Sequence, residues 1–304
     1  MARRPLYQVG QTTPFQISRA KIEDYIRCPR CFVLEQKHGL KRPSSVPFTL
    51  NTAVDHQLKK EFDIYRASGQ VHPLVAAAGL DLVPFSHPQL DEWRENFKGV
   101  RFATDDFLVT GAVDDLWVNS DGELFVVDYK STGRQQAVTE LGEGGFYDGY
   151  RRQMEIYQWL LRKNGFKVSN TGFWVYVTAT QKQDRFDGQL VFESNIVSYE
   201  GDSSWVDGIL NEIKVTLENP ELPFSGTDCD LCRFARDRNT LIAQFEEQDE
   251  LPPVCAECGN RMSKAVYGMT SGPLGPGFVS MGCIVGFDDP KWVCTTCEGY
   301  VEDL

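Results

Sequence analysis

Asp114, Asp128 and Lys130 are the residues whose types and spacing best suit chemistry. Asp128 and Lys130 stand two residues apart at the end of an apolar run, and a β-strand has a period of two residues. Their side chains should therefore project to one face of the strand, while Tyr129 points to the other. Carboxylates beside apolar strand residues are costly to bury unless a cation compensates their charge. A divalent metal ion together with the lysine would provide that compensation.

The stretch that holds these residues predicts a β-hairpin. Two apolar runs, 112–118 and 124–127, flank a turn signal at 119–122, which reads Asn-Ser-Asp-Gly. Asp114 interrupts the first predicted strand, and Asp128 ends the second. Both carboxylates are thus expected on one hairpin.

A strand aspartate, a hairpin and an Asp-x-Lys sequence together resemble the core of the PD-(D/E)XK nuclease superfamily. Gln153 and Tyr157 in RRQMEIYQWLL match the Gln-x-x-x-Tyr helix motif of its RecB-like branch, which includes the CRISPR-associated RecB-like exonucleases. The resemblance implies an α/β fold with a mixed central sheet flanked by helices, the restriction-endonuclease-like core, over about residues 15–240. It also implies a Mg²⁺- or Mn²⁺-dependent deoxyribonuclease that acts in DNA repair, recombination or defence.

The resemblance also implies a role for each residue of the motif. Asp114, Asp128 and the backbone carbonyl of Tyr129 would hold the Mg²⁺ or Mn²⁺ ion. Lys130 would orient the attacking water and offset negative charge as it develops. The family's glutamine and tyrosine reach toward the active site and the nucleic-acid backbone, which makes Gln153 and Tyr157 further candidate catalytic residues.

A predicted helix over 51–67 offers one more metal ligand. The RecB-like pattern places a histidine four residues after a glycine here, whereas this chain has Asn51 and Asp55 in those two places. At 100° per residue Asp55 lies at the margin of the apolar stripe, and His56 lies nearly opposite it. Asp55 is therefore predicted as an ancillary metal ligand, with a solvated helix carboxylate as the alternative, and His56 is predicted to be exposed.

The nine cysteines form four Cys-x-x-Cys pairs and one single residue, which in a cytosolic chain points to metal binding. Two pairs bracket the nuclease-like region: Cys28, Cys31, Cys229 and Cys232. Several RecB-like nucleases close this domain around a four-iron cluster, usually with one cysteine in front and three behind. The two-plus-two arrangement here is also what tetrahedral zinc favours, so the expected cofactor is an iron–sulfur cluster or Zn²⁺.

The remaining two pairs predict a zinc ribbon over residues 251–304, with Cys255, Cys258, Cys294 and Cys297 as ligands. A unit of this size buries too little surface to be stable alone, so the metal has a structural reason to be there. Cys283 is predicted to be a buried residue of a strand. The ribbon is not basic, which favours a role in binding a partner, such as a helicase or another repair protein, or in positioning the substrate.

Other elements are predicted from periodicity and turn signals. Helices are expected from Ser18 to the first cysteine pair and over 90–97, 148–164 and 203–217, and strands over 171–180 and 189–198. The glycine-rich segment 133–149 predicts either a mobile flap near the substrate or an ordinary exposed loop. A charged linker is predicted at 244–250.

Composition limits the partners. The net charge of −12 argues against a protein that coats nucleic acid through bulk positive charge, although local basic patches can still hold phosphates. Neither a run of eighteen apolar residues nor a signal-peptide core at the start of the chain occurs in the sequence, so a cytoplasmic protein without a membrane partner is expected.

Three functions follow as alternatives. The first is a DNA nuclease, the second a catalytically inactive nucleic-acid-binding module on a nuclease fold, and the third an adaptor. A simpler interpretation of the hairpin is a partly buried salt bridge between Asp114 and Lys130, with no metal at all.

Overall fold

The computed structural model describes residues 5–43, 49–246, 252–269, 272–282, 289–297 and 300–301. The chain divides into two compact units, Met1–Cys229 and Asp230–Leu304. This division falls eleven residues before the end of the predicted nuclease region at 240 (240 − 229 = 11). Among the described residues, none of the helices is both long and apolar enough to cross a membrane.

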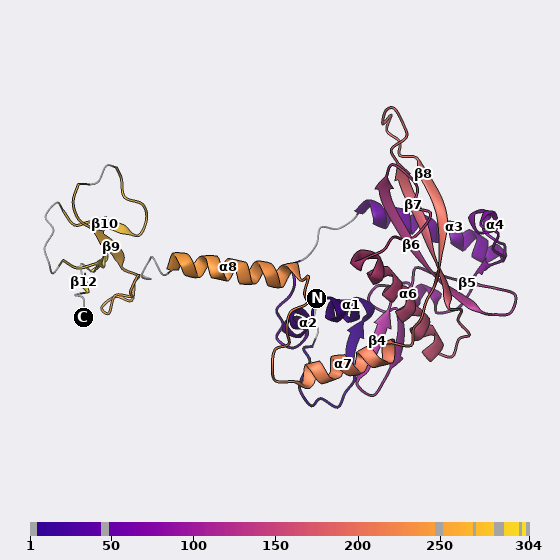
Figure 1. Cartoon of the computed structure of the whole chain (residues 1–304), viewed down its shortest axis with the longest axis horizontal. Helices are drawn as coiled ribbons and strands as arrows, with labels where there is room; N and C mark the ends of the chain where they lie inside the picture. The colour runs from indigo at the N-terminus through magenta and orange to yellow at the C-terminus, as the bar shows by residue number, and fades with distance from the viewer. Residues whose placement is uncertain are drawn as a thin grey trace. The chain divides into compact units, whose positions relative to one another are not determined.

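A five-stranded mixed sheet forms the centre of the first unit. Its strand order is β2-β5-β6-β7-β8, in which β6 and β7 run parallel and the other neighbours run antiparallel (Figure 1). The five strands are β2 (Val83–Pro84), β5 (Asp115–Val118), β6 (Leu124–Arg134), β7 (Thr171–Thr180) and β8 (Phe192–Glu200). The mixed α/β architecture is the one predicted.

The predicted hairpin is confirmed as β5 and β6, which pair Trp117 with Phe125. Its turn forms at the predicted residues, where the Asn119 side-chain oxygen accepts hydrogen bonds from the backbone N–H groups of Asp121 and Glu123. Gly122 takes a φ of +71°, a conformation that glycine adopts without strain. The first strand is shorter than predicted, since it begins at Asp115.

Helices α3 (Thr49–Ser68) and α6 (Gly145–Lys163) pack against β6. Val127 and Tyr129 belong to the same core cluster as Phe62 of α3, whereas Val126 belongs to the cluster that holds Met154 of α6. Alternation along β6 therefore sends odd-numbered side chains toward α3 and even-numbered ones toward α6. Asp128 and Lys130 are even-numbered, so they face the α6 side, as the period of two predicts.

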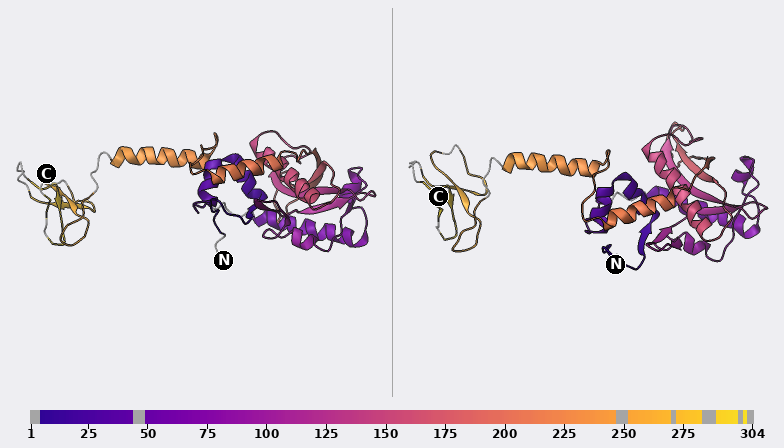
Figure 2. Two further views of the ribbon diagram at one scale, coloured as in Figure 1. Left: turned by 90° about the horizontal axis from the view of Figure 1, so that it is seen from below. Right: turned by 60° about the horizontal axis from the view of Figure 1, so that its bottom comes forward.

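A second, three-stranded sheet was not predicted. It has the order β1-β4-β3, with β1 (Phe15–Ser18) parallel and β3 (Val100–Ala103) antiparallel to β4 (Phe107–Gly111). Helices α1 (Arg19–Arg27), α2 (Pro29–Gln36) and α7 (Val206–Glu218) share its core, and Figure 2 shows the orange α7 beside the indigo α1 and α2. Ser18 is at the predicted N-cap position of α1, but its side chain makes no capping hydrogen bond.

The strand predicted over 171–180 is confirmed as β7 with the same bounds, and the remaining predicted elements agree in kind and differ at their ends. The short predicted helix over 90–97 is α5 (Leu90–Trp93), which ends four residues early, and α4 (Pro73–Ala77) was not predicted. The predicted loop over 133–149 is shorter than expected, because β6 runs to Arg134 and α6 begins at Gly145.

The second unit combines one helix with a small sheet. Helix α8 (Asp230–Glu246) extends into the predicted linker at 244–250, so the first three residues of that linker are helical (246 − 244 + 1 = 3). The sheet has the order β10-β9-β11-β12, formed by β9 (Ser263–Val266), β10 (Phe278–Ser280), β11 (Trp292–Val293) and β12 (Tyr300–Val301). The prediction for Cys283 lies outside the described residues.

Candidate active site

Asp114, Asp128 and Lys130 lie together beside β6. Asp114 is in the bend before β5, and its Oδ2 accepts the backbone N–H of Tyr129 at 2.9 Å, which fixes the carboxylate against β6. Asp128 is fully buried, and its Oδ2 pairs with the Lys130 ammonium. Asp114 pairs instead with Lys59. The salt bridge between Asp114 and Lys130, the metal-free interpretation, is therefore not the arrangement that forms.

The electrostatics of this cluster show an excess of negative charge. Burial, reinforced by the neighbouring Asp114, raises the pKa of Asp128 to about 7, although Lys130 acts in the opposite direction. Burial alone would lower the pKa of Lys130, but Asp128 and Asp114 outweigh it and raise that pKa. Lys130 is therefore cationic at neutral pH, while the Asp128 carboxyl group is partly protonated there. A divalent cation at the carboxylates would replace that proton.

Asp55 joins this cluster from α3. Lys59 places its Nζ 2.9 Å from Asp55 Oδ2 and 3.4 Å from Asp114 Oδ1, and so links the two carboxylates. Burial and the charge of Asp114 raise the pKa of Asp55, against the effect of Lys59. Asp55 is therefore half-buried beside Asp114, while His56 is exposed, as predicted. Sequence reasoning missed Lys59, although its i,i+4 spacing from Asp55 was the available signal.

Gln153 and Tyr157 reach the same site from α6. Gln153 donates from Nε2 to Asp128 Oδ1 at 2.7 Å and to the Tyr157 hydroxyl at 3.2 Å. The Tyr157 ring is only 3% exposed, and a Cβ at Gly111 would lie 2.8 Å from it, so glycine leaves the room that the ring needs. Arg19, missed from the sequence, places its guanidinium 6.0 Å from the centre of that ring. The motif thus orients Asp128 from within the core.

Asp115, the neighbour of Asp114, lies in a different environment. It is fully buried and accepts hydrogen bonds from Arg66 and Arg94, and its Oδ2 accepts the Tyr129 hydroxyl at 2.7 Å. All its charge is thus compensated by protein groups, which marks it as structural. Tyr129 contributes its side chain here and its backbone N–H to Asp114, and its carbonyl remains a predicted metal ligand.

The donor set beside β6 suits a hard divalent cation. Oxygen ligands from a few carboxylates are what Mg²⁺ binds in proteins, and Asp114 and Asp128 supply them. Asp55 lies next to Asp114, but the three carboxylates are not among the groups of described residues whose ligand atoms all lie within 4.8 Å of one another. The raised pKa values of Asp55 and Asp128 give an independent reason, because a cation would stabilise both in their ionised forms.

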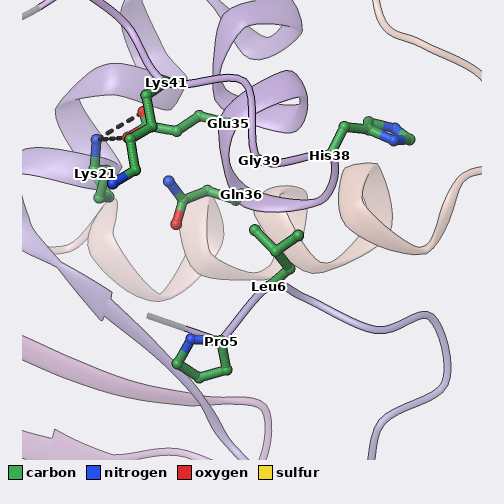
Figure 3. Close-up of a pocket in the computed structure, with 8 residues that line it drawn as sticks. All are labelled: Pro5, Leu6, Lys21, Glu35, Gln36, His38, Gly39 and Lys41. Carbon is green, nitrogen blue, oxygen red and sulfur yellow. Dashed lines mark hydrogen bonds and ion pairs between the residues drawn. The ribbon is translucent and has the colours of Figure 1, made fainter. Parts of the chain in front are cut away.

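A separate hollow of about 390 Å³ contains none of these residues (Figure 3). Lys21 and Glu35 form an ion pair of 2.7 Å in its wall, beside Gln36 and His38. Lys21 and Glu35 thus neutralise each other, Lys41 adds one positive charge to the lining, and the hollow offers no group comparable to the buried acid of β6.

The first predicted cysteine set comes together. The Sγ atoms of Cys28, Cys31, Cys229 and Cys232 all lie within 4.8 Å of one another. Cys28 Sγ also accepts the backbone N–H groups of Cys31 and Gly226, contacts that stabilise a thiolate. Four such sulfurs can bind either Zn²⁺ or an iron–sulfur cluster.

The second predicted set also comes together, within the second unit. Sγ–Sγ distances are 3.3 Å between Cys255 and Cys297 and 3.4 Å between Cys258 and Cys294. Backbone N–H groups of the Cys294–Cys297 knuckle lower the pKa of Cys294 to about 6. Since a Zn–S bond of about 2.3 Å sets a tetrahedral edge of about 3.8 Å, these sulfurs are close to the spacing that one zinc ion requires.

Comparisons of the chain with known proteins show which family it belongs to. A family model described as the PD-(D/E)XK nuclease superfamily matches residues 16–236. No curated protein matches the chain significantly. Among solved structures, the crystal structure of SSO0001 is similar at 15% identity and a TM-score of 0.33, over 68% of this chain and 79% of that chain, a likeness too low to bear on function. Because the matched region spans most of the chain and contains every carboxylate gathered beside β6, the chain belongs to the PD-(D/E)XK nuclease superfamily.

Proposed function

We propose that this protein hydrolyses phosphodiester bonds of DNA with Mg²⁺ or Mn²⁺, as a RecB-like member of its superfamily. One observation carries the proposal. The buried Asp128 is held by Gln153 on one oxygen and by Lys130 on the other, with Asp114 fixed beside it by the Tyr129 N–H. A purely structural carboxylate would be fully compensated, as Asp115 is, whereas Asp128 keeps a pKa of about 7.

Each side chain has a distinct role in this proposal. Asp114 and Asp128 would hold the ion together with the Tyr129 carbonyl, and Asp55 would assist. The bound ion would supply charge neutralisation at the phosphate and lower the pKa of a water molecule. Lys130 would hold the attacking water and offset charge in the transition state, and Gln153 would keep Asp128 oriented. Tyr157, which Gln153 also contacts, would act as a positioning residue.

The two cysteine sets would serve stability. Zn²⁺ in the ribbon would hold the small sheet of the second unit, and an iron–sulfur cluster or Zn²⁺ would hold the sulfurs of Cys28, Cys31, Cys229 and Cys232. Metal analysis with a visible absorption spectrum of anaerobically purified protein distinguishes these cases, because an iron–sulfur cluster absorbs visible light and zinc does not. If the ribbon binds a helicase or another repair protein, the nuclease would act in DNA repair, recombination or defence.

A cleavage assay tests the proposal. Labelled single-stranded DNA, double-stranded DNA and RNA of one sequence are incubated with the whole protein and Mg²⁺ or Mn²⁺. We expect DNA cleavage that Asp128→Asn reduces at least about 10²-fold. Asp121→Asn, a change in the exposed turn of the same hairpin, should leave the rate unchanged.

Two other outcomes would replace the proposal. Salt-dependent DNA binding that survives Lys130→Ala, without hydrolysis under either ion, would identify a DNA-binding protein on a nuclease fold. A stable complex with another protein, accompanied by little DNA affinity, would identify an adaptor.

A further inference from the structure

An aromatic pocket adjoins the carboxylate cluster of the first unit. It has a volume of about 320 Å³, and Lys130 forms part of its wall. Phe146, Tyr147 and Tyr150 line it from the first turns of α6, and Arg134 lines it from the end of β6. This volume is at the lower end of the range for small-ligand pockets, so the space suits one flat ring system better than a folded peptide.

The three rings form one cluster with an open face. The Phe146 ring lies 4.8 Å from the Tyr150 ring and 5.5 Å from the Tyr147 ring, centre to centre. Phe146 is nevertheless 62% exposed, which is costly for a large apolar side chain that serves only packing. An exposed aromatic face beside two fixed rings is a platform on which another π-system can stack.

Two cationic side chains lie at this platform: Lys130, which is paired with Asp128, and Arg134, which supplies the positive charge for a ligand. Lys130 Nζ lies 4.7 Å from the centre of the Tyr150 ring, and Arg134 donates from Nη2 to the Tyr147 hydroxyl at 2.8 Å. None of the described residues that line the pocket is acidic, although the chain as a whole has a net charge of −12. Local positive charge in an acidic protein selects an anionic ligand. A platform for a planar ring with cations at its edge fits a nucleotide, whose base stacks while its phosphate meets Arg134.

We infer that Phe146, Tyr147 and Tyr150, with Arg134, form a subsite that stacks an unpaired nucleobase next to the bond to be cut. Bases within a duplex are stacked on one another and cannot reach this platform, so the subsite selects single-stranded DNA. This inference rests on the proposed function in taking DNA as the substrate, and it adds the strand state that the site accepts. Stacking tolerates any base, so no sequence preference is expected.

Binding without hydrolysis tests the subsite independently of catalysis. The probe is a fluorescein-labelled oligothymidylate of about twelve nucleotides, and its anisotropy is measured with the whole protein in a chelator-free buffer that contains neither Mg²⁺ nor Mn²⁺. We expect Phe146→Ala to weaken binding about 5- to 150-fold, the range found for loss of one base–aromatic stack. Phe146→Tyr should restore affinity. Phe97→Ala, which removes an 87% exposed phenylalanine outside the pocket, should have no effect.

An oligonucleotide of the same length without bases separates stacking from charge. Wild type should bind this abasic probe as weakly as Phe146→Ala binds oligothymidylate, and the substitution should change abasic binding little. Equal affinities of wild type and Phe146→Ala for oligothymidylate would overturn the subsite, even if both proteins cleave DNA. Tight, Phe146-dependent binding without cleavage under Mg²⁺ or Mn²⁺ would instead keep the subsite and reject the proposed hydrolysis.

Discussion

Asp128 is the residue on which the proposed hydrolysis depends, because its surroundings leave its charge incompletely compensated. Gln153 donates one hydrogen bond and Lys130 one ion pair, while Asp114 adds a second negative charge nearby. Burial makes this arrangement costlier than it would be in water. A carboxylate in this state gains more from a bound cation than a surface carboxylate does, and its protonation must compete with that cation.

The first prediction concerns pH. Since burial and Asp114 raise the pKa of Asp128 to about 7, the carboxyl is protonated below that pH and must lose its proton to bind an ion. The affinity for Mn²⁺ should therefore rise about tenfold per pH unit up to about pH 7 and level off above it. Calorimetric titrations of protein free of Mg²⁺ and Mn²⁺, with its cysteine-bound metal retained, measure this slope at several pH values. A flat profile in wild type would contradict the assignment, and Asp128→Asn should remove the slope.

The second prediction concerns Gln153. Loss of the amide that orients a ligand typically costs 10- to 100-fold in activity or metal affinity, so Gln153→Ala should reduce the cleavage rate by about that factor. Gln158→Ala is the matched control, because Gln158 is a second buried glutamine on α6 whose Nε2 bonds to the Asn170 carbonyl, away from the carboxylates. Equal losses in both variants would show that Gln153 acts only through the stability of the helix.

At the scale of elements, one face of β6 packs Val127 and Tyr129 toward α3, and the other carries Asp128 and Lys130. Odd-numbered side chains such as Tyr129 pack toward α3 and support Asp115, while even-numbered ones face α6. The bend before β5 turns the neighbouring acids Asp114 and Asp115 toward different partners. Asp114 accepts the Tyr129 N–H, whereas Asp115 pairs with Arg66. One strand thus serves both the stability of the sheet and the site.

The third prediction concerns Asp115. Asp115→Ala leaves Arg66 and Arg94 without their buried partner, and breaking such a pair costs about 3–5 kcal/mol of unfolding free energy. Asp63 pairs with the same two arginines but its side chain is 46% exposed, so Asp63→Ala should cost only about 0–1 kcal/mol. Urea unfolding monitored by tryptophan fluorescence gives both values. Similar losses would argue against a special role for the buried acid.

Some of these elements could be predicted and others could not, for physical reasons. The hairpin follows from local signals, since the Asn119 turn and the alternation of β6 act over a few residues. In the β1-β4-β3 sheet, the pairing of β1 with β4 joins residues some ninety positions apart, Phe15 to Phe107, and no local pattern encodes it, whereas β3 and β4 form a local hairpin that was missed. Lys59 and Arg19 escaped prediction because their roles depend on which helix packs against which strand.

At the scale of the whole molecule, the two units have different sources of stability. The first unit has two hydrophobic core clusters around its sheets, whereas the described core of the second contains few residues beyond Met262, Trp292 and the cysteines. So small a core contributes too little to offset the entropy of ordering the chain. A metal bound by Cys255, Cys258, Cys294 and Cys297 would therefore supply much of the folding free energy of this unit.

The fourth prediction follows from that difference. Cys294→Ser should remove the zinc proposed for the second unit, detected by elemental analysis, and should abolish hydrogen-exchange protection over residues 252–269, 272–282 and 289–297. Protection of β6 and α6 in the first unit should stay as in wild type. Cys283→Ser, at the one cysteine outside the Cys-x-x-Cys pairs, is the control. Full zinc content in Cys294→Ser would show that this cysteine is not a ligand.

The most direct measurement of the central claim is the anomalous scattering of Mn²⁺ in crystals of the whole protein. We expect a peak within about 2.2 Å of one oxygen each from Asp114 and Asp128, with Lys130 alongside and with no peak in Asp128→Asn crystals. The contradicting result is Mn²⁺ bound only at other sites while Asp128 still pairs with Lys130. The crystals must contain Mn²⁺ at a concentration that supports cleavage in solution.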